Sequence, residues 1–283
     1  MNTLKKYTAI PLLVVALAIG VSNVHAQKAS GPRPFEVGEE LHFEAEFSRA
    51  LLRKLDVADL KFRATRTPVA AESAEASPYE LTFTADVASK GFFARLFNLK
   101  FRERVVSTVE PISFTVQKTT ILDEQGKRVR ATEATFDRAK GKMTWTLRAP
   151  NDPGFETRHK ITDFSGQLQD VLSAIYFIRT QKLEVGKSFE IFIGDGGHIY
   201  RIPTKVVEKK RMKTVLGRVD ALRVVPELFG PERLIDEEKG EFSIWVTADA
   251  RHIPLGGRVK TDYGTFDIKL KRVITNPPPQ VIP

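Results

Sequence analysis

Residues 79–87 read Tyr-Glu-Leu-Thr-Phe-Thr-Ala-Asp-Val, and this stretch decides the fold. Every second side chain from Tyr79 to Val87 is apolar, and the side chains between them are Glu, Thr or Asp. Such alternation is typical of a β-strand with one buried face and one face in water. The same pattern recurs at residues 41–47, 189–193, 242–248 and 266–270. The chain is therefore expected to form an antiparallel sheet.

Clusters of turn-forming residues separate these strands at the spacing of hairpins. They occupy residues 123–127, 137–141, 195–198 and 263–265. Residues 68–78, rich in Ala, Glu and Ser, are expected to form the loop of a long hairpin. Residues 167–182 instead carry apolar side chains at helical spacing over most of the circumference, which predicts a buried helix.

These patterns predict a mainly β fold of about a dozen strands. The expected architecture is a large curved antiparallel sheet or half-barrel, or two packed β-sheets, with one central α-helix at 167–182. A single β-rich domain would cover residues 35–273. Within it, residues 35–150 would hold the N-terminal strands and residues 187–273 the C-terminal strands.

The first 26 residues have the organisation of a secretory signal peptide. Lys5 and Lys6 precede an uncharged apolar run at residues 9–21, and small residues around Ala26 suit cleavage there. The run is shorter than the ~20 residues that span a bilayer. We therefore expect a periplasmic protein that is no longer integral to a membrane after cleavage. Residues 27–34 and the Pro-rich tail, 274–283, are expected to be mobile.

Composition narrows the possible functions. The chain has 283 residues, 42% of them hydrophobic and 28% charged, which are values of a folded globular protein. It contains no cysteine, which excludes disulfides, thiolate metal sites and a cysteine nucleophile. The net charge of +9 falls by two when the signal is removed. In an exported protein this charge indicates either a surface for envelope anions or a basic surface that only aids solubility, and not a nucleic-acid partner.

No recognised catalytic or cofactor motif is present, so no enzyme, metal or cofactor is predicted. Asp195 with His198, and Asp249 with His252, have a spacing that would orient a general base. The same spacing is more typical of polar hairpin turns. Neither a Gly-x-Ser-x-Gly elbow nor a Gly-rich phosphate loop occurs in the sequence.

Three groups of residues are candidates for binding. Aromatic and basic residues lie together at Phe92, Phe93, Arg95 and Phe97, where they would contact a membrane or an apolar ligand if exposed and join the core if buried. A basic run is expected at a hairpin tip, either as a solvated turn or as a patch for anionic lipid or an acidic partner: Lys209, Lys210 and Arg211.

The predicted helix supplies the third group. Its Tyr176 and Arg179 are candidate ligand contacts. The interpretation we favour for Arg179, and for Asp170, is that they anchor the helix to the sheet.

Several short motifs, taken in order, resemble the bacterial domain-of-unknown-function family 3108. They are Phe-Glu-Val-Gly-Glu-Glu-Leu-His-Phe at 35–43, Asp-Val-Leu-Ser-Ala-Ile-Tyr-Phe-Ile-Arg at 170–179 and Ile-Trp-Val-Thr-Ala-Asp at 244–249. The resemblance covers about residues 35–273 and implies an exported, predominantly β protein without an established activity. It also implies a likeness in outline to the curved sheets of outer-membrane lipoprotein carriers, which by itself establishes no function.

Three functions therefore remain open. The first is a protein that binds a lipid or another apolar or anionic envelope component in a curved sheet, and an open cavity beneath the helix would favour it. The second is an interaction protein that docks on an envelope protein, and a packed interior would favour it. The third and least favoured is a hydrolase.

Overall fold

The computed structural model describes residues 34–68, 77, 79–90 and 100–275. Its first half is a series of eight antiparallel strands joined in sequence order. Their bounds are β1 (Glu40–Arg49), β2 (Leu52–Pro68), β3 (Tyr79–Ser89), β4 (Phe101–Glu110), β5 (Thr115–Gln125), β6 (Arg128–Asp137), β7 (Lys142–Arg148) and β8 (Arg158–Asp163).

A helix, α2 (Val171–Thr180), separates this half from six further strands. They are β9 (Ser188–Asp195), β10 (His198–Thr214), β11 (Gly217–Pro226), β12 (Gly240–Thr247), β13 (Pro254–Thr261) and β14 (Gly264–Ile274). The predicted mainly β fold with one helix between two groups of strands is confirmed. Strand β8 was not predicted: it lies beyond residues 35–150, where the N-terminal strands were expected.

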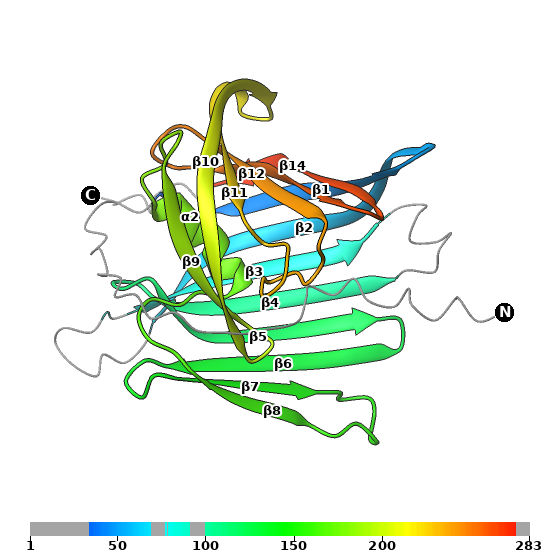
Figure 1. Ribbon diagram of the computed structural model, residues 1–283, viewed down its shortest axis with the longest axis vertical. Helices are drawn as coiled ribbons and strands as arrows, with labels where there is room; N and C mark the ends of the chain where they lie inside the picture. The colour runs from blue at the N-terminus through cyan, green and yellow to red at the C-terminus, as the bar shows by residue number, and fades with distance from the viewer. Residues whose placement is uncertain (1–33, 69–76, 78, 91–99, 276–283) are drawn as a thin grey trace, which may run out of the picture.

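All fourteen strands belong to one sheet, in the order β8-β7-β6-β5-β4-β3-β2-β1-β14-β13-β12-β11-β10-β9. The first and last strands pair at its middle, where Glu40 lies opposite Ile274 and Ser48 opposite Thr265. The first half of the chain runs outward from this central pair to β8, and the second half runs inward from β9 to β14, so β8 and β9 form the two edges. The sheet is strongly curled, and β9 and β10 cross over the strands of the first half (Figure 1).

Both edges are protected by contacts. The segment before the helix runs along β9, where Gln169 forms a parallel bridge with Ile193. On β8, the hydroxyl of Thr162 donates to the carbonyl of Gly197 in the β9–β10 turn at 2.6 Å. Covering an edge in this way blocks pairing with other chains. The Gln169 bridge also explains why the helix is shorter than the predicted 167–182, since residues before Asp170 are extended.

Helix α2 begins at a reciprocal cap. The carboxylate of Asp170 accepts the backbone N–H of Ser173 at 2.6 Å, and the Ser173 hydroxyl accepts the N–H of Asp170 at 2.9 Å. This capping box satisfies two of the amides that a helix start leaves unpaired. The Thr119 hydroxyl of β5 also donates to Asp170. The cap therefore starts the helix and fixes it to the sheet.

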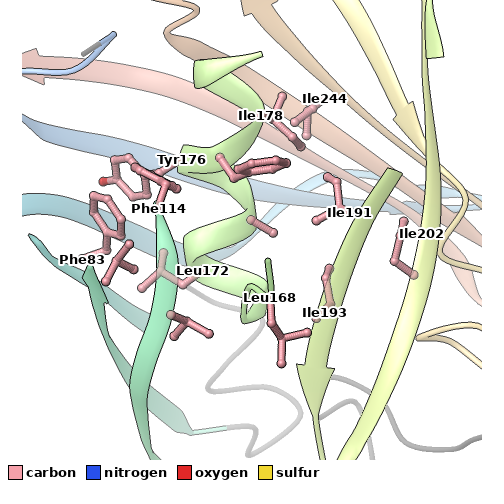
Figure 2. Close-up of a cluster of buried hydrophobic side chains, with 14 of the residues drawn as sticks. Phe83, Phe114, Leu168, Leu172, Tyr176, Ile178, Ile191, Ile193, Ile202 and Ile244 are labelled. Carbon is pink, nitrogen blue, oxygen red and sulfur yellow. The ribbon is translucent and has the colours of Figure 1, made fainter. Parts of the chain in front are cut away.

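The space around α2 is filled by side chains from both halves of the sheet (Figure 2). Tyr176 stacks on Phe83 with ring centroids 3.9 Å apart, and Phe35 meets both rings edge-on. On the other side of the helix lie the isoleucines of β9, β10 and β12, namely Ile191, Ile193, Ile202 and Ile244. The interior beneath the helix is thus packed, which favours the interaction-protein hypothesis over a ligand enclosed beneath the helix.

Candidate functional site

The candidate binding residues predicted from the sequence lie in different surroundings in the structure. Phe92, Phe93, Arg95 and Phe97 lie outside the described residues. Tyr176 is buried in the core, with 1% of its surface exposed. Burial raises the pKa of its hydroxyl well above the ordinary value.

Arg179 is equally buried, and its guanidinium is bound from several directions. Its Nη1 and Nη2 donate to the two carboxylate oxygens of Glu39, at 2.5 and 3.0 Å. Nε donates to the carbonyl of Arg251 at 3.1 Å, and Nη2 also donates to that of Pro34 at 2.8 Å. Arg179 thus anchors the helix, as the favoured interpretation expected. Glu39, its partner, was not identified from the sequence.

The basic run is not at a hairpin tip, and this part of the prediction is wrong. Lys209, Lys210 and Arg211 lie inside the long strand β10, opposite Leu222, Ala221 and Asp220 of β11. The turn falls at Val215 and Leu216, because Gly217, at φ 88°, supplies the left-handed conformation that reverses the chain. Asp220 lies 3.3 Å from the Lys209 ammonium and 4.0 Å from the Arg211 guanidinium, so it partly neutralises the run.

Neither Asp–His pair forms a catalytic dyad. The imidazole of His198 lies 2.8 Å from the Lys160 ammonium, and burial followed by this charge lowers its pKa. Nδ1 of His252 lies 2.8 Å from the carbonyl oxygen of Arg179. Asp249 accepts from Thr247 and Arg251, and these bonds outweigh burial and lower its pKa. Both pairs therefore belong to turns.

Two half-buried carboxylates lie on different strands, Asp195 on β9 and Glu103 on β4. Burial raises the pKa of Asp195 to about 7, and the charges of Asp170 and Glu103 act in the same direction. Burial and the neighbouring Asp123 also raise the pKa of Glu103. A carboxyl that holds a proton near neutral pH suits acid–base chemistry. Among the described residues, however, neither a histidine nor a hydroxyl bonds to Asp195, and no group of acids and histidines has the geometry of a metal site.

A groove lies on the opposite, polar face of the sheet, turned away from α2. It has a volume of about 840 Å³ and crosses six neighbouring strands, from β14 through β1, β2, β3 and β4 to β5. Strand alternation produces it, because the residues between the buried positions of each strand point to this face. Its lining includes His42, Glu44, Asp59, Lys61, Asp86, Ala88, Arg102, Arg104, Leu122, Glu124, Lys271 and Arg272.

Ion pairs tie together most charges in the groove. Glu44 accepts from Lys271 and Lys90, at 2.6 and 2.7 Å, and these hydrogen bonds lower its pKa to about 2. Asp86 receives two bonds from the guanidinium of Arg104, at 2.7 and 3.1 Å. The groove acids Glu44 and Asp86 are therefore neutralised by their own neighbours.

Two arginines of the groove have no such partner. Within the described part of the chain, Arg102 of β4 and Arg272 of β14 take part in no ion pair, and both are exposed. Four strand spacings separate β4 from β14, or about 20 Å measured along the sheet. The exposed side chain of Leu122, on β5 next to β4, adds an apolar contact at the Arg102 end of the groove. The groove therefore carries two separated guanidiniums without an ion-pair partner, and Glu124 of β5 lies opposite Arg102 in the strand register.

The sequence alone does not reveal this groove, for a physical reason. Most of the lining residues occupy ordinary solvent-facing positions of their strands, and only the strand register brings them beside one another. Arg104, for example, lies opposite both Asp86 and Leu122, which are 18 residues before and 18 after it. The available signal was the excess of charge at alternate positions, and that pattern alone does not give the register.

Comparisons with known proteins identify a family and add no activity. The model of a family described as "Protein of unknown function (DUF3108)" matches residues 52–271. A search of curated proteins finds no match. Among solved structures, the chain is similar to a β-barrel-like protein of domain of unknown function DUF1849 from Brucella abortus. The two share 10% identity over 84% of this chain and 97% of that one, with a TM-score of 0.49.

No helix in the part of the chain that the structure describes combines the length and apolar content needed to cross a membrane.

Proposed function

This chain belongs to the DUF3108 family, which is described as being of unknown function, and from its groove we propose that it is a non-enzymatic binding protein of the bacterial envelope. Its ligand is elongated and carries at least two anionic groups. It lies across the polar face of the sheet between Arg102 and Arg272. The signal-like residues 1–26 support export to the periplasm.

The observation that carries this proposal is the pair of unpartnered arginines. An exposed guanidinium presents donors in a fixed plane that matches phosphate and carboxylate oxygens. Two of them on strands four spacings apart favour a ligand that reaches both. The packed interior around α2 argues against a carrier that encloses its ligand there, so the ligand is placed on the outer face.

Calorimetric titration of the purified protein with a short linear polyphosphate tests the groove. The Arg102→Gln/Arg272→Gln variant should bind at least tenfold more weakly, since each charge-assisted bond contributes about 1.5–3 kcal/mol. Orthophosphate, which reaches only one arginine, should bind more weakly than polyphosphate. The matched control is Arg138→Gln/Arg218→Gln, which removes two exposed arginines outside the groove. Equal affinity of the groove variant and the wild type would contradict the proposal.

The natural ligand requires a separate measurement. Native mass spectrometry of protein purified gently from its own periplasm, followed by organic extraction, should show an adduct of stoichiometric mass. An apo mass that persists across preparations, together with crosslinking of the groove to a protein, would favour the interaction-protein alternative.

Fractionation of cells expressing the chain with and without residues 1–26 tests export. Retention of the full-length chain in the cytoplasm would contradict a periplasmic role.

A further inference from the structure

The hairpin that joins β1 to β2 exposes two leucines at its apex. Arg49 and Leu52 are the last paired residues, so Ala50 and Leu51 form the turn. Leu51 is 98% exposed and Leu52 is 45% exposed. Single exposed leucines are ordinary on protein surfaces, but two adjacent ones at the end of a hairpin form a small apolar point. The hairpin projects beyond the neighbouring strand ends (Figure 1).

The backbone of this hairpin is strained where glycine or asparagine would be favoured. Ala50 has a φ of 45° and Lys54 a φ of 53°, and both lie in the left-handed region. The Lys54 amide donates to the Ser48 hydroxyl at 3.1 Å, which holds the strand in place below the turn. Strain of this kind is retained only where surrounding contacts fix it, and it concentrates at functional positions.

Basic side chains surround the apolar apex. Arg49, Arg53 and Lys54 are exposed, and within the described residues none of them has an acidic partner. We call residues 49–54 the β1–β2 tip. It combines two apolar side chains with three unpaired cations on one short convex segment. A convex apolar point ringed by cations matches a flat anionic layer with an apolar interior more closely than it matches a protein surface.

A neighbouring turn extends the same end of the sheet. Ser48 pairs with Thr265, so the β13–β14 turn lies beside the base of the β1–β2 tip. Tyr263 in that turn is 52% exposed. A Cβ on Gly264 would approach the Phe47 ring to 2.6 Å and the Ser48 carbonyl oxygen to 2.7 Å, so the two turns are closely packed. Tyrosine is enriched at the headgroup level of membranes.

We propose that the β1–β2 tip is a membrane-docking element for anionic bilayers. Leu51 and Leu52 enter the boundary between headgroups and acyl chains, and Arg49, Arg53 and Lys54 contact lipid phosphates. Tyr263 lies at the headgroup level beside them. This inference is independent of the groove, because no residue of the tip lines it.

Cosedimentation of the mature protein with vesicles tests the docking. Wild type should bind vesicles of phosphatidylglycerol mixed with phosphatidylcholine, and high salt or pure phosphatidylcholine should weaken the binding. Leu51→Ser/Leu52→Ser should bind about tenfold more weakly, because its apex is no longer apolar. Arg49→Gln/Arg53→Gln/Lys54→Gln should lose the preference for phosphatidylglycerol. The matched control is Val215→Ser, which replaces an exposed apolar residue at the β10–β11 turn.

A Leu51→Trp variant reports insertion directly. Its tryptophan emission should shift to the blue when phosphatidylglycerol vesicles are added. The variant keeps the two tryptophans of the wild type, so the wild-type chain with the same vesicles is the reference. Circular dichroism checks that each variant is folded, and polyphosphate titration of Leu51→Ser/Leu52→Ser should be unchanged. Unaltered vesicle binding by that variant would overturn the proposal. Absence of wild-type binding to phosphatidylglycerol vesicles would also overturn it, and the tip would then fit a protein partner instead.

Discussion

Arg179 and Glu39 form a bidentate ion pair in the interior, although 140 residues separate them in the sequence. The Arg179 side chain is 0% exposed and the Glu39 side chain 4%. Arg179 lies in the last turn of α2, and Glu39 directly precedes β1 at the middle of the sheet. Two backbone carbonyls accept the remaining guanidinium donors that point inward. The pair therefore joins the only described helix to the central strands.

Removing one partner of this pair should destabilise the fold strongly. Glu39→Gln leaves a buried guanidinium without its counter-charge, and we expect a loss of about 3–5 kcal/mol in the free energy of unfolding. Urea denaturation followed by circular dichroism measures it. The matched control is Glu184→Gln, which breaks an exposed pair with Lys182 and should leave the urea midpoint unchanged. If the two variants unfold at the same urea concentration, the pair is not what fixes the helix.

A glycine in β9 allows the two halves of the sheet to approach. A Cβ on Gly194 would lie 2.8 Å from Sδ of Met143, 2.8 Å from Cε1 of Phe136 and 3.4 Å from Cδ2 of Leu168. Gly194→Ala should therefore destabilise the protein by about 1–3 kcal/mol through overpacking. Thermal unfolding provides the measurement.

Gly154→Ala serves as the control for this prediction, since the nearest atom to its Cβ would be 3.7 Å away. It should be neutral or slightly stabilising, because alanine restricts the unfolded chain. A Gly194→Ala variant as stable as the wild type would mean that Met143 and Phe136 move aside, and that the contact of β9 with β6 and β7 is loose.

Local patterns predicted the strands and their turns. Alternation at residues 79–87 corresponds to β3, and the turn signals at 123–127, 137–141, 195–198 and 263–265 each lie at or overlap the turn that joins two paired strands. The central helix was also predicted from its apolar spacing, and Asp170 and Arg179 anchor it as expected. These features depend on neighbouring residues alone, which is why the sequence shows them.

Long-range pairing could not be predicted in the same way. The contact of β1 with β14 and the Glu39 partner of Arg179 join the two ends of the domain. Strand β8, with the pattern Arg-His-Lys-Ile-Thr-Asp, has little apolar alternation because it lies at an edge. The extension of β10 through Lys209, Lys210 and Arg211 was missed for a related reason. Those residues lie in an exposed part of the hairpin, where no apolar alternation marks a strand.

The half-buried carboxyl of Asp195 should make stability depend on pH. Its pKa is raised from 3.8 to about 7 by burial, assisted by the charges of Asp170 and Glu103. The folded state therefore binds more protons than the unfolded state between about pH 4 and 7. The free energy of unfolding should therefore fall as the pH rises from about 4 to 7. Above about pH 7 the ionisation of Asp195 should cause no further change. Asp195→Asn removes the ionisation and should stabilise the protein at pH 8 by roughly 1–3 kcal/mol.

Thermal unfolding of wild type and Asp195→Asn from pH 4 to pH 8 measures this dependence. The difference in stability should be smallest at pH 4, where the wild-type carboxyl is protonated in the folded state, and largest at pH 8. Asp262→Asn, in the exposed β13–β14 turn, is the control and should follow the wild-type curve. A constant difference at every pH would mean that Asp195 is ionised throughout, with solvent or a cation reaching the interior from the β9–β10 turn.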